Sequence, residues 1–354
     1  AAYMLATTRS FRTSSERDLV NWHADSDPIF ARLAGEVHRS DKVTKLELLI
    51  AGIPGQPATE SVRRRARVNG HDTPLLHLLG HLNAVLFSPE DVDLVAGPAE
   101  RRRRYLDITL SQVDHRYVRT LRRYLRILTQ RNALLKLSRD RSVPPDEFEY
   151  WDAQLTETGA ALLLTRLRAV ATLNRELRAI YPTLTDQPAP LTLEYRSSVP
   201  LEDFLPPDPG GRAGDDGAEA ELARRFTSQL AALAPRERAQ GVTLSGLHRD
   251  DVAFTVDGVD LRTYGSRGQQ RLGALALKLA ETAFMRASTG DQPLLLLDDV
   301  MSELDPTRRQ HLQSAISGHD QVLMTATELL FFDQGLLANA ARYRVASGTV
   351  TREQ

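Results

Sequence analysis

The run Pro293-Leu294-Leu295-Leu296-Leu297-Asp298-Asp299 restricts the possible folds of this chain more than any other stretch. Its consecutive leucines predict a strand that is buried on both faces, as a parallel sheet covered by helices requires. Two carboxylates at the carboxyl end of such a strand lie where α/β sheets bind ligands. The run matches the Walker B pattern, so we predict that Asp298 holds Mg²⁺ and that Asp299 orients or deprotonates the attacking water. An ordinary helix cap after a core strand is the alternative interpretation.

A Gly/Ser-rich turn lies upstream, at Tyr264-Gly265-Ser266-Arg267-Gly268-Gln269-Gln270-Arg271. It opens a predicted helix that runs to about Ala287 and is rich in Ala, Leu, Lys and Glu. Such an opening points backbone N–H groups and the positive end of the helix at an arriving anion. In ABC-type ATPases this element is the signature motif, which contacts the γ-phosphate of ATP held by a second subunit. Ser266, Gly268 and Gln269 are therefore candidate nucleotide contacts in trans, and a plain helix start is the alternative.

These two motifs, together with five shorter runs in the same order, resemble the RecF family of bacterial DNA replication and repair ATPases. The family is related to the SMC-type ABC proteins, and the resemblance spans nearly the whole chain. The five runs are Arg9 to Thr13, Phe87 to Asp91, Arg101 to Asp107, Gln130 to Leu135 and Gly246 to Asp251.

The resemblance implies an α/β fold with an ABC-type ATPase lobe, in which helices cover a mixed sheet, plus a helical lobe of long antiparallel helices. It implies ATP and Mg²⁺ as cofactors and a weak, DNA-stimulated ATPase activity. The active form would be an ATP-driven head-to-tail homodimer on DNA that assists recombinase loading at gaps. Its partners would be double-stranded DNA or single-strand/double-strand junctions, and proteins of the RecR and RecO types.

Three further residues are implied to lie near the nucleotide: Asp305, Thr325 and Thr327. Residues 321–328 read as another buried strand that ends in hydroxyl groups. Most ABC proteins carry a histidine here that senses the γ-phosphate, and which of the two threonines takes that place is left open. The run from Phe87 to Asp91 either opens the next helix or lies near the nucleotide.

The middle of the chain predicts two long helices. Apolar residues at steps of three and four indicate one helix from Ala99 to about Leu137. A second helix is indicated after the Pro144-Pro145 break, by apolar positions from Trp151 to Ile180. We expect an antiparallel pair, which divides the chain into an ATPase lobe at 1–98, a helical arm at 99–240 and the rest of the ATPase lobe at 241–354. The arginines of the first helix are either a solvated face or phosphate contacts for duplex DNA. The DNA-binding candidates are Arg101, Arg102, Arg103, Arg104, Arg119 and Arg123.

Two Asx-Gly pairs, Asn69-Gly70 and Asp257-Gly258, predict β-hairpins, and a last hairpin is predicted around Ser347-Gly348. Composition sets looser limits. Lys and Arg number 45 against 46 Asp and Glu, so a surface for nucleic acid must be a local patch. The absence of cysteine excludes disulfides and thiolate zinc sites, which suits a cytoplasmic protein. No apolar run approaches the roughly 18 residues that span a bilayer, so no membrane partner is expected.

The sequence contains no G-x-x-x-x-G-K-[ST] phosphate-binding loop. Residues Ala1 to Leu5 resemble the tail of the helix that follows such a loop, so we expect an N-terminally incomplete sequence. A natural protein that has discarded the loop is the alternative.

Three functions are therefore weighed. The favoured one is the ATP-dependent DNA-binding protein described above. The second is a non-catalytic DNA-binding scaffold, because without the loop nothing cradles the β- and γ-phosphates. The third, a transporter ATPase subunit, is disfavoured by the long paired helices and by the missing sensor histidine.

Overall fold

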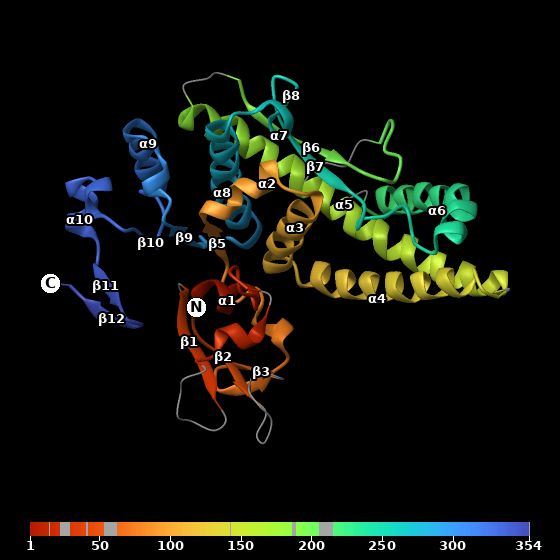
Figure 1. The fold of residues 1–354 in the computed structure, drawn as a ribbon, viewed down its shortest axis with the longest axis horizontal. Helices are drawn as coiled ribbons and strands as arrows, with labels where there is room; N and C mark the ends of the chain where they lie inside the picture. The colour runs from red at the N-terminus through yellow and green to blue at the C-terminus, as the bar shows by residue number, and fades with distance from the viewer. Residues whose placement is uncertain are drawn as a thin grey trace.

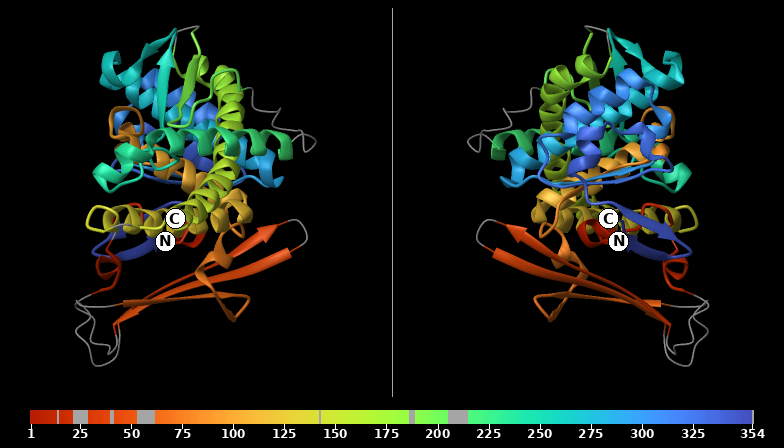
Figure 2. Two further views of the ribbon diagram at one scale, coloured as in Figure 1. Left: turned by 90° about the vertical axis from the view of Figure 1, so that its right-hand side faces the viewer. Right: turned by 90° about the vertical axis from the view of Figure 1, so that its left-hand side faces the viewer.

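The computed structural model describes residues 1–13, 15–21, 29–39, 42–52, 62–141, 143–185, 189–204 and 215–353. Helices and strands alternate along the chain, so the predicted α/β class is confirmed. Figure 1 shows three parts: a central region of helices around a small parallel sheet, an antiparallel sheet near the N-terminus, and a long helical arm. In the side views of Figure 2 the antiparallel sheet forms a layer at one end of the molecule, opposite the upper helices.

The parallel sheet contains β5 (Ala84–Phe87), β9 (Leu294–Asp298) and β10 (Val322–Thr325), in the order β10-β9-β5. Leu295 and Leu297 belong to the main core with residues of α8 (Arg267–Thr289), whereas Leu296 packs in a separate cluster with Ala6 of α1 (Ala2–Thr7). Helices thus cover both faces of β9, which explains its unbroken leucines. The prediction of a strand buried on both faces is confirmed.

The expectation of a second buried strand at residues 321–328 is wrong. Strand β10 is at the edge of the sheet in the described part of the chain, and its residues alternate between half-buried and exposed. Leu323 is 49% exposed. An apolar run of this length has the same composition in a central strand and at an edge, so its pattern alone did not reveal the difference.

The antiparallel sheet has the order β1-β2-β3-β4, with β1 at Phe30–Arg39, β2 at Lys42–Gly52, β3 at Val62–Val68 and β4 at His71–Thr73. Alternate residues of β2 are buried against α1 and the short helix Leu75–Leu78. Asn69 and Gly70 connect β3 to β4 with φ angles of 52° and 83°. Both angles lie in the left-handed region that a type I′ turn requires, so the predicted hairpin is confirmed.

The arm consists of α3 (Ala99–Val113), α4 (His115–Leu137), α5 (Pro145–Leu184) and α6 (Asp215–Gln240). The single helix predicted from Ala99 to Leu137 is wrong, because Asp114 interrupts it with extended backbone at φ −136° and ψ 106°. The Asp114 carboxylate accepts a hydrogen bond from the Arg116 N–H and so caps α4. Helix α5 begins at Pro145, at the predicted break, and extends about one turn beyond Ile180. Helices α4 and α5 pack along each other (Figure 1).

A second three-stranded sheet joins the arm to the central region. Strand β6 (Leu191–Arg196) pairs antiparallel with β7 (Asp251–Val256), which forms the predicted hairpin with β8 (Val259–Asp260). The pairing crosses the proposed boundary at residue 240, and the division into lobes by residue number stays a prediction.

The remaining elements are short. They are the single-turn helices Glu16–Leu19, Pro89–Asp91, Met301–Glu303 and Leu329–Phe331, the helices α2 (Val92–Ala96), α7 (Leu261–Tyr264), α9 (Pro306–Ile316) and α10 (Gln334–Asn339), and the terminal hairpin of β11 (Tyr343–Ala346) and β12 (Thr349–Arg352). Within the described residues, no helix combines the length and the apolar composition needed to cross a bilayer.

Candidate nucleotide site

The two predicted Walker B acids follow each other at the carboxyl end of β9. Asp298 is the last residue of the strand, and Asp299 has a left-handed backbone with φ 52°. Thr325 of β10 lies opposite: its Oγ1 donates to Asp298 Oδ1 at 2.7 Å, and its backbone carbonyl accepts the Asp299 N–H at 3.2 Å. Thr325 thus fixes both the carboxylate of one acid and the backbone of the other.

Of the two threonines left open by the sequence, only Thr325 touches the acids. Thr327 is exposed, and within the described part of the chain no hydrogen bond of its side chain is found. Strand pairing explains this difference, because Thr325 is in register with Asp298 across the parallel sheet.

Arg12 is a site residue that the sequence analysis missed. Its Nη2 lies 3.2 Å from Asp298 Oδ2, although the side chain is 74% exposed. The turn that carries it is held by Ser10 Oγ, which accepts the N–H groups of Arg12 and Thr13 at 3.2 and 3.3 Å. The guanidinium also lies 5.5 Å from the ring centroid of Phe11. The only signal in the sequence was the run from Arg9 to Thr13, which carried a family likeness but no role.

The carboxylates fit a magnesium ion that is shared with a nucleotide. Asp299 Oδ1 is buried and has no hydrogen-bond partner among the described residues. Asp298 presents its oxygens to Thr325 and Arg12, groups that an ion would compete with. The described residues contain no cluster of three or more His, Cys, Asp or Glu that would hold a metal by protein ligands alone. Mg²⁺ usually takes one or two carboxylates and completes its shell with phosphate oxygens and water, so the lack of a larger cluster is compatible with a magnesium ion at these acids.

The signature turn opens the predicted helix, α8, with a capped start. Ser266 Oγ accepts the Gln269 N–H at 3.2 Å, and Gln269 Oε1 accepts the Ser266 N–H at 2.8 Å, which together form a capping box. Gln269 is therefore engaged within the turn itself. Gln270 is buried and donates to the Leu261 carbonyl at 2.9 Å, which ties the turn to α7.

Gly268 leaves room at the start of α8. A Cβ built on it would lie 3.9 Å from Arg308 Nη1 and from Ser266 Oγ. Arg308 belongs to α9, where its guanidinium pairs with Asp305 at 3.0 Å. Asp305 Oδ1 also accepts the Arg308 N–H and caps α9, so its carboxylate is used locally.

The signature helix and the loop after the acids are joined by one ion pair. Arg271 Nη2 lies 2.8 Å from Glu303 Oε2, and its Nη1 donates to the Glu303 carbonyl at 3.3 Å. By contrast, no hydrogen bond or ion pair in the described part of the chain connects Ser266, Gly268 or Gln269 to Asp298 or Asp299.

The prediction that Arg102 binds DNA is wrong, because this side chain is buried. Arg102 is 3% exposed, and its guanidinium makes a two-pronged pair with Asp251 at 2.6 and 3.0 Å while donating to the Gly97 carbonyl at 2.8 Å. It therefore cannot contact DNA in this structure. Its neighbour Arg103 is half-buried and donates to the Asp250 carbonyl at 2.8 Å.

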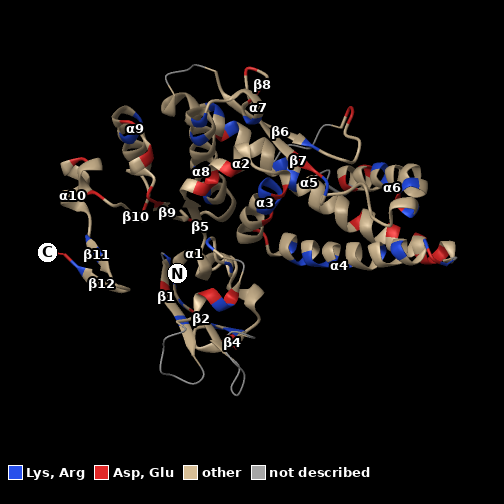
Figure 3. Ribbon diagram, viewed as in Figure 1, with Lys and Arg blue, Asp and Glu red and all other residues tan. Residues whose placement is uncertain are grey.

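The other candidates are exposed. Arg101 and Arg104 lie on α3 and Arg119 on α4, and Arg123 of α4 contacts Gln154 and Glu157 of α5. Figure 3 shows Lys and Arg residues along α3 and α4. Arg101, Arg104, Arg119 and Arg123 therefore stay candidates for DNA binding, and that role remains a prediction.

The run from Gly246 to Asp251 is enclosed by the arm. Asp250 accepts hydrogen bonds from the Tyr195 hydroxyl and the Ser198 N–H, both at 2.8 Å, and its burial raises the pKa of the carboxyl. His248 Nε2 lies 3.2 Å from the Thr243 carbonyl and Nδ1 lies 3.0 Å from the Tyr124 hydroxyl. Because a carbonyl only accepts, Nε2 carries the proton and Nδ1 accepts from Tyr124. Burial lowers the pKa of His248 to about 4.

Two fully buried arginines complete this connection. Arg166 of α5 donates to Asp107 at 2.7 Å and to the Leu247 carbonyl at 3.2 Å. Arg131 of α4 donates to Glu237 at 2.7 Å and to Asp152 at 2.6 Å. The chain from Thr243 to Asp251 leads through β7 and β8 to the signature turn. It is anchored to four helices of the arm, through Arg103 of α3, Tyr124 of α4, Arg166 of α5 and Glu237 of α6.

The chain is similar over nearly its whole length to known RecF proteins. The DNA replication and repair protein RecF of Chloroflexus aurantiacus is 45% identical over 361 residues, which cover 99% of this chain and 89% of that protein. Its counterpart in Roseiflexus castenholzii is 42% identical over 365 residues, which cover 98% and 88%. The structure of the recombination mediator protein RecF-ATP in the RecFOR pathway shares 26% identity and superposes with a TM-score of 0.82, covering 99% of this chain and 86% of that one. No protein-family model matches the chain.

These similarities agree with the motifs on which the resemblance was based. The identity of 42–45% and the fold shared with a solved RecF structure both extend over almost the full length of the chain. The chain belongs to the RecF family of DNA replication and repair proteins.

Proposed function

We propose that the protein is an ATP-dependent DNA-binding protein of recombinational repair, in which two copies face each other head to tail with ATP between them. Asp298 would hold Mg²⁺, Asp299 would orient the attacking water, and Ser266 and Gly268 of the second copy would contact the γ-phosphate. When bound, the metal would supply charge stabilisation for the phosphates. The RecF-ATP relative supports the choice of nucleotide.

The observation that carries this proposal is the separation, within one chain, of the signature turn from the two acids. The signature turn presents a capped helix start, while the acids lie at the end of β9 and share no hydrogen bond or ion pair with it among the described residues. A second copy supplies the missing contact. Arg12, next to Asp298, would exchange its carboxylate partner for phosphate oxygens when ATP and Mg²⁺ arrive, because guanidinium groups bind phosphates well.

The exposed arginines of the arm support DNA binding as the output of this cycle. Arg101, Arg104, Arg119 and Arg123 would contact phosphates rather than bases, so affinity would depend on salt more than on sequence. Partners of the RecR and RecO types, and a role in recombinase loading at gaps, are proposed from the RecFOR pathway of the solved relative.

Light scattering with and without Mg-ATP tests the assembly. We expect the mass to double in ATP for a chain that carries a phosphate-binding loop ahead of residue 1, and the Ser266→Arg variant of that chain to stay monomeric. If the chain that carries the loop, without the Ser266→Arg change, keeps the same mass in ATP, the head-to-tail dimer is refuted.

A second candidate, a DNA-binding scaffold without catalysis, is favoured by the lack of a G-x-x-x-x-G-K-[ST] run in the sequence. The Asp299→Asn variant separates the two. A catalytic role predicts a 10²- to 10⁴-fold loss of phosphate release, a range typical of positioned general bases, with the ATP-driven dimer retained. A scaffold predicts no turnover in either protein and DNA binding that is indifferent to ATP.

A further inference from the structure

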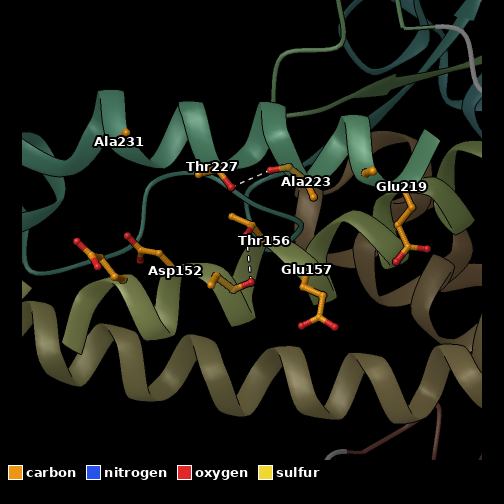
Figure 4. Close-up of a pocket in the computed structure, with 10 residues that line it drawn as sticks. Asp152, Thr156, Glu157, Glu219, Ala223, Thr227 and Ala231 are labelled. Atoms are coloured by element: carbon orange, nitrogen blue, oxygen red, sulfur yellow. Dashed lines mark hydrogen bonds between the residues drawn. The ribbon is translucent and has the colours of Figure 1, made fainter. Parts of the chain in front are cut away.

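A groove of about 640 Å³ lies between α5 and α6 on the arm, away from the nucleotide site (Figure 4). Its volume is in the range of roughly 300–1,000 Å³ that is typical of ligand sites. The walls come from two helices that run side by side, and the groove is open to solvent. Its floor consists of small residues: Ala153 and Thr156 from α5, and Ala220, Ala223, Thr227 and Ala231 from α6.

The floor offers little hydrogen bonding. Thr156 Oγ1 donates to the Ala153 carbonyl at 3.1 Å, and Thr227 Oγ1 donates to the Ala223 carbonyl at 2.9 Å. Figure 4 shows both bonds directed back to the helix of origin. With their hydroxyls satisfied, the threonines add methyl groups to a surface of alanines, so the floor favours an apolar occupant.

The rim is acidic. Glu149, Asp152, Glu157 and Glu219 line the groove together with its small floor residues. Arg131 binds Asp152 from below at 2.6 Å, and Arg123 is 3.6 Å from Glu157, but both arginines belong to α4 and do not line the groove. Four carboxylates against these two arginines leave the rim with net negative charge. This favours an occupant with positive charge at its edges, because opposite charges across an interface select the partner.

This charge excludes nucleic acid from the groove. Carboxylates at the rim repel phosphates, whereas exposed arginines on α4, among them Arg119, Arg122 and Arg126, attract them. The arm thus carries surfaces of two different kinds.

We propose that the groove binds a basic amphipathic helix of a partner protein. The floor residues of α6 at 220, 223, 227 and 231 repeat every three or four positions and form a stripe of roughly 16 Å, about three turns of a helix. Alanine side chains let a third helix approach closely, and its apolar face replaces solvent on the floor. Lysines or arginines flanking that face then reach the carboxylates of the rim.

The test uses the whole protein and two labelled peptides of about 18 residues, roughly five helical turns. Both share one Leu/Ala face, and one carries lysine at every flanking position where the other carries glutamate. In fluorescence anisotropy the lysine peptide should bind at least tenfold more tightly than the glutamate peptide. The Ala231→Trp variant, which fills an exposed part of the floor, and the double variant Glu149→Lys with Glu157→Lys should each weaken binding of the lysine peptide at least tenfold.

Matched controls locate the site. Glu100→Lys changes an exposed carboxylate on α3 outside the groove, and Ala231→Ser changes the floor with little added volume, so both should bind like the parent chain. Circular dichroism checks that each variant is folded. Equal affinity for the two peptides, or binding that Ala231→Trp leaves intact, would overturn the proposal. So would a concentration-dependent dimer that Ala231→Trp abolishes, because the groove would then belong to a second copy.

Discussion

The burial of Arg102 shows how four adjacent arginines take different roles. Arg102 precedes Leu106 by one helical turn and so lies on the apolar stripe of α3, where its charge is matched by Asp251. The spacing was visible in the sequence, but the identity of the partner, about 150 positions away, was not. Removing one member of a buried ion pair leaves the other uncompensated, which typically costs about 3–5 kcal/mol.

We therefore expect Arg102→Ala to lower the free energy of unfolding by about 3–5 kcal/mol, and Arg101→Ala to change it by less than about 0.5 kcal/mol. Urea unfolding measures both. DNA binding should respond in the opposite order, since Arg101 is exposed and Arg102 is not. Equal stability of the two variants would contradict the structural role given to Arg102.

Thr325 gives a second prediction at this scale. Replacing it with valine keeps the shape but removes the hydroxyl that holds Asp298, so we expect a loss of about 1 kcal/mol of stability and impaired Mg-ATP turnover. Thr327→Val is the matched control and should behave like the parent. Calorimetry measures the loss of stability, and phosphate release measures turnover. A stronger defect in Thr327→Val would show that Thr327, not Thr325, is the threonine of the site.

Among the elements, those predicted best have their cause in their own residues. Strand β9 is leucine on both faces because it is covered on both, and the turn at Asn69-Gly70 needs two left-handed residues that these types supply. The errors arose where the cause lies elsewhere. The apolar spacing continues in step from Leu110 to Tyr117, so it did not reveal the break at Asp114, and the exposure of β10 depends on its place at an edge.

The geometry of the candidate site could be anticipated from the sequence only where its cause is local. Both acids and the capped turn follow from local motifs, whereas the contact of Arg12 with Asp298 joins residues from opposite ends of the chain. No periodicity or spacing encodes such a contact.

The break between α3 and α4 depends on one cap. Asp114→Ala removes the side chain that accepts the Arg116 N–H, and we expect a loss of about 1 kcal/mol of stability. Asp140→Ala, at an exposed position beyond the end of α4, is the control and should have little effect. Thermal unfolding measures the difference. A variant as stable as the parent would show that packing alone sets the start of α4.

For the whole molecule, the enclosed His248 predicts a dependence of stability on pH. Its pKa is about 4 in the folded protein, below the ordinary value of 6.5, so the unfolded chain takes up the proton first as the pH falls. Stability should be full above about pH 6.5, decline by up to about 3 kcal/mol toward pH 4, and change no further from this group below that.

The measurement is urea unfolding at several pH values between 7.5 and 4.5. In His248→Gln, which cannot take up a proton, the decline in this window should be smaller than in the parent. Parallel profiles for the two proteins would mean that protonation of His248 is not resisted by the fold.

The pairing of β5 with β9 also determines when the protein can fold. Ala84 is paired with Leu294 across the parallel sheet, so a ribosome must complete most of the chain before that sheet can close. Until then β5 presents an open, fully apolar edge, the kind of surface that invites aggregation. The antiparallel sheet closes within residues 30–73 and can form early. Synthesis therefore leaves a long interval in which a finished antiparallel sheet and arm await the strand that carries the two acids of the candidate site, and chaperone dependence should be concentrated in that interval.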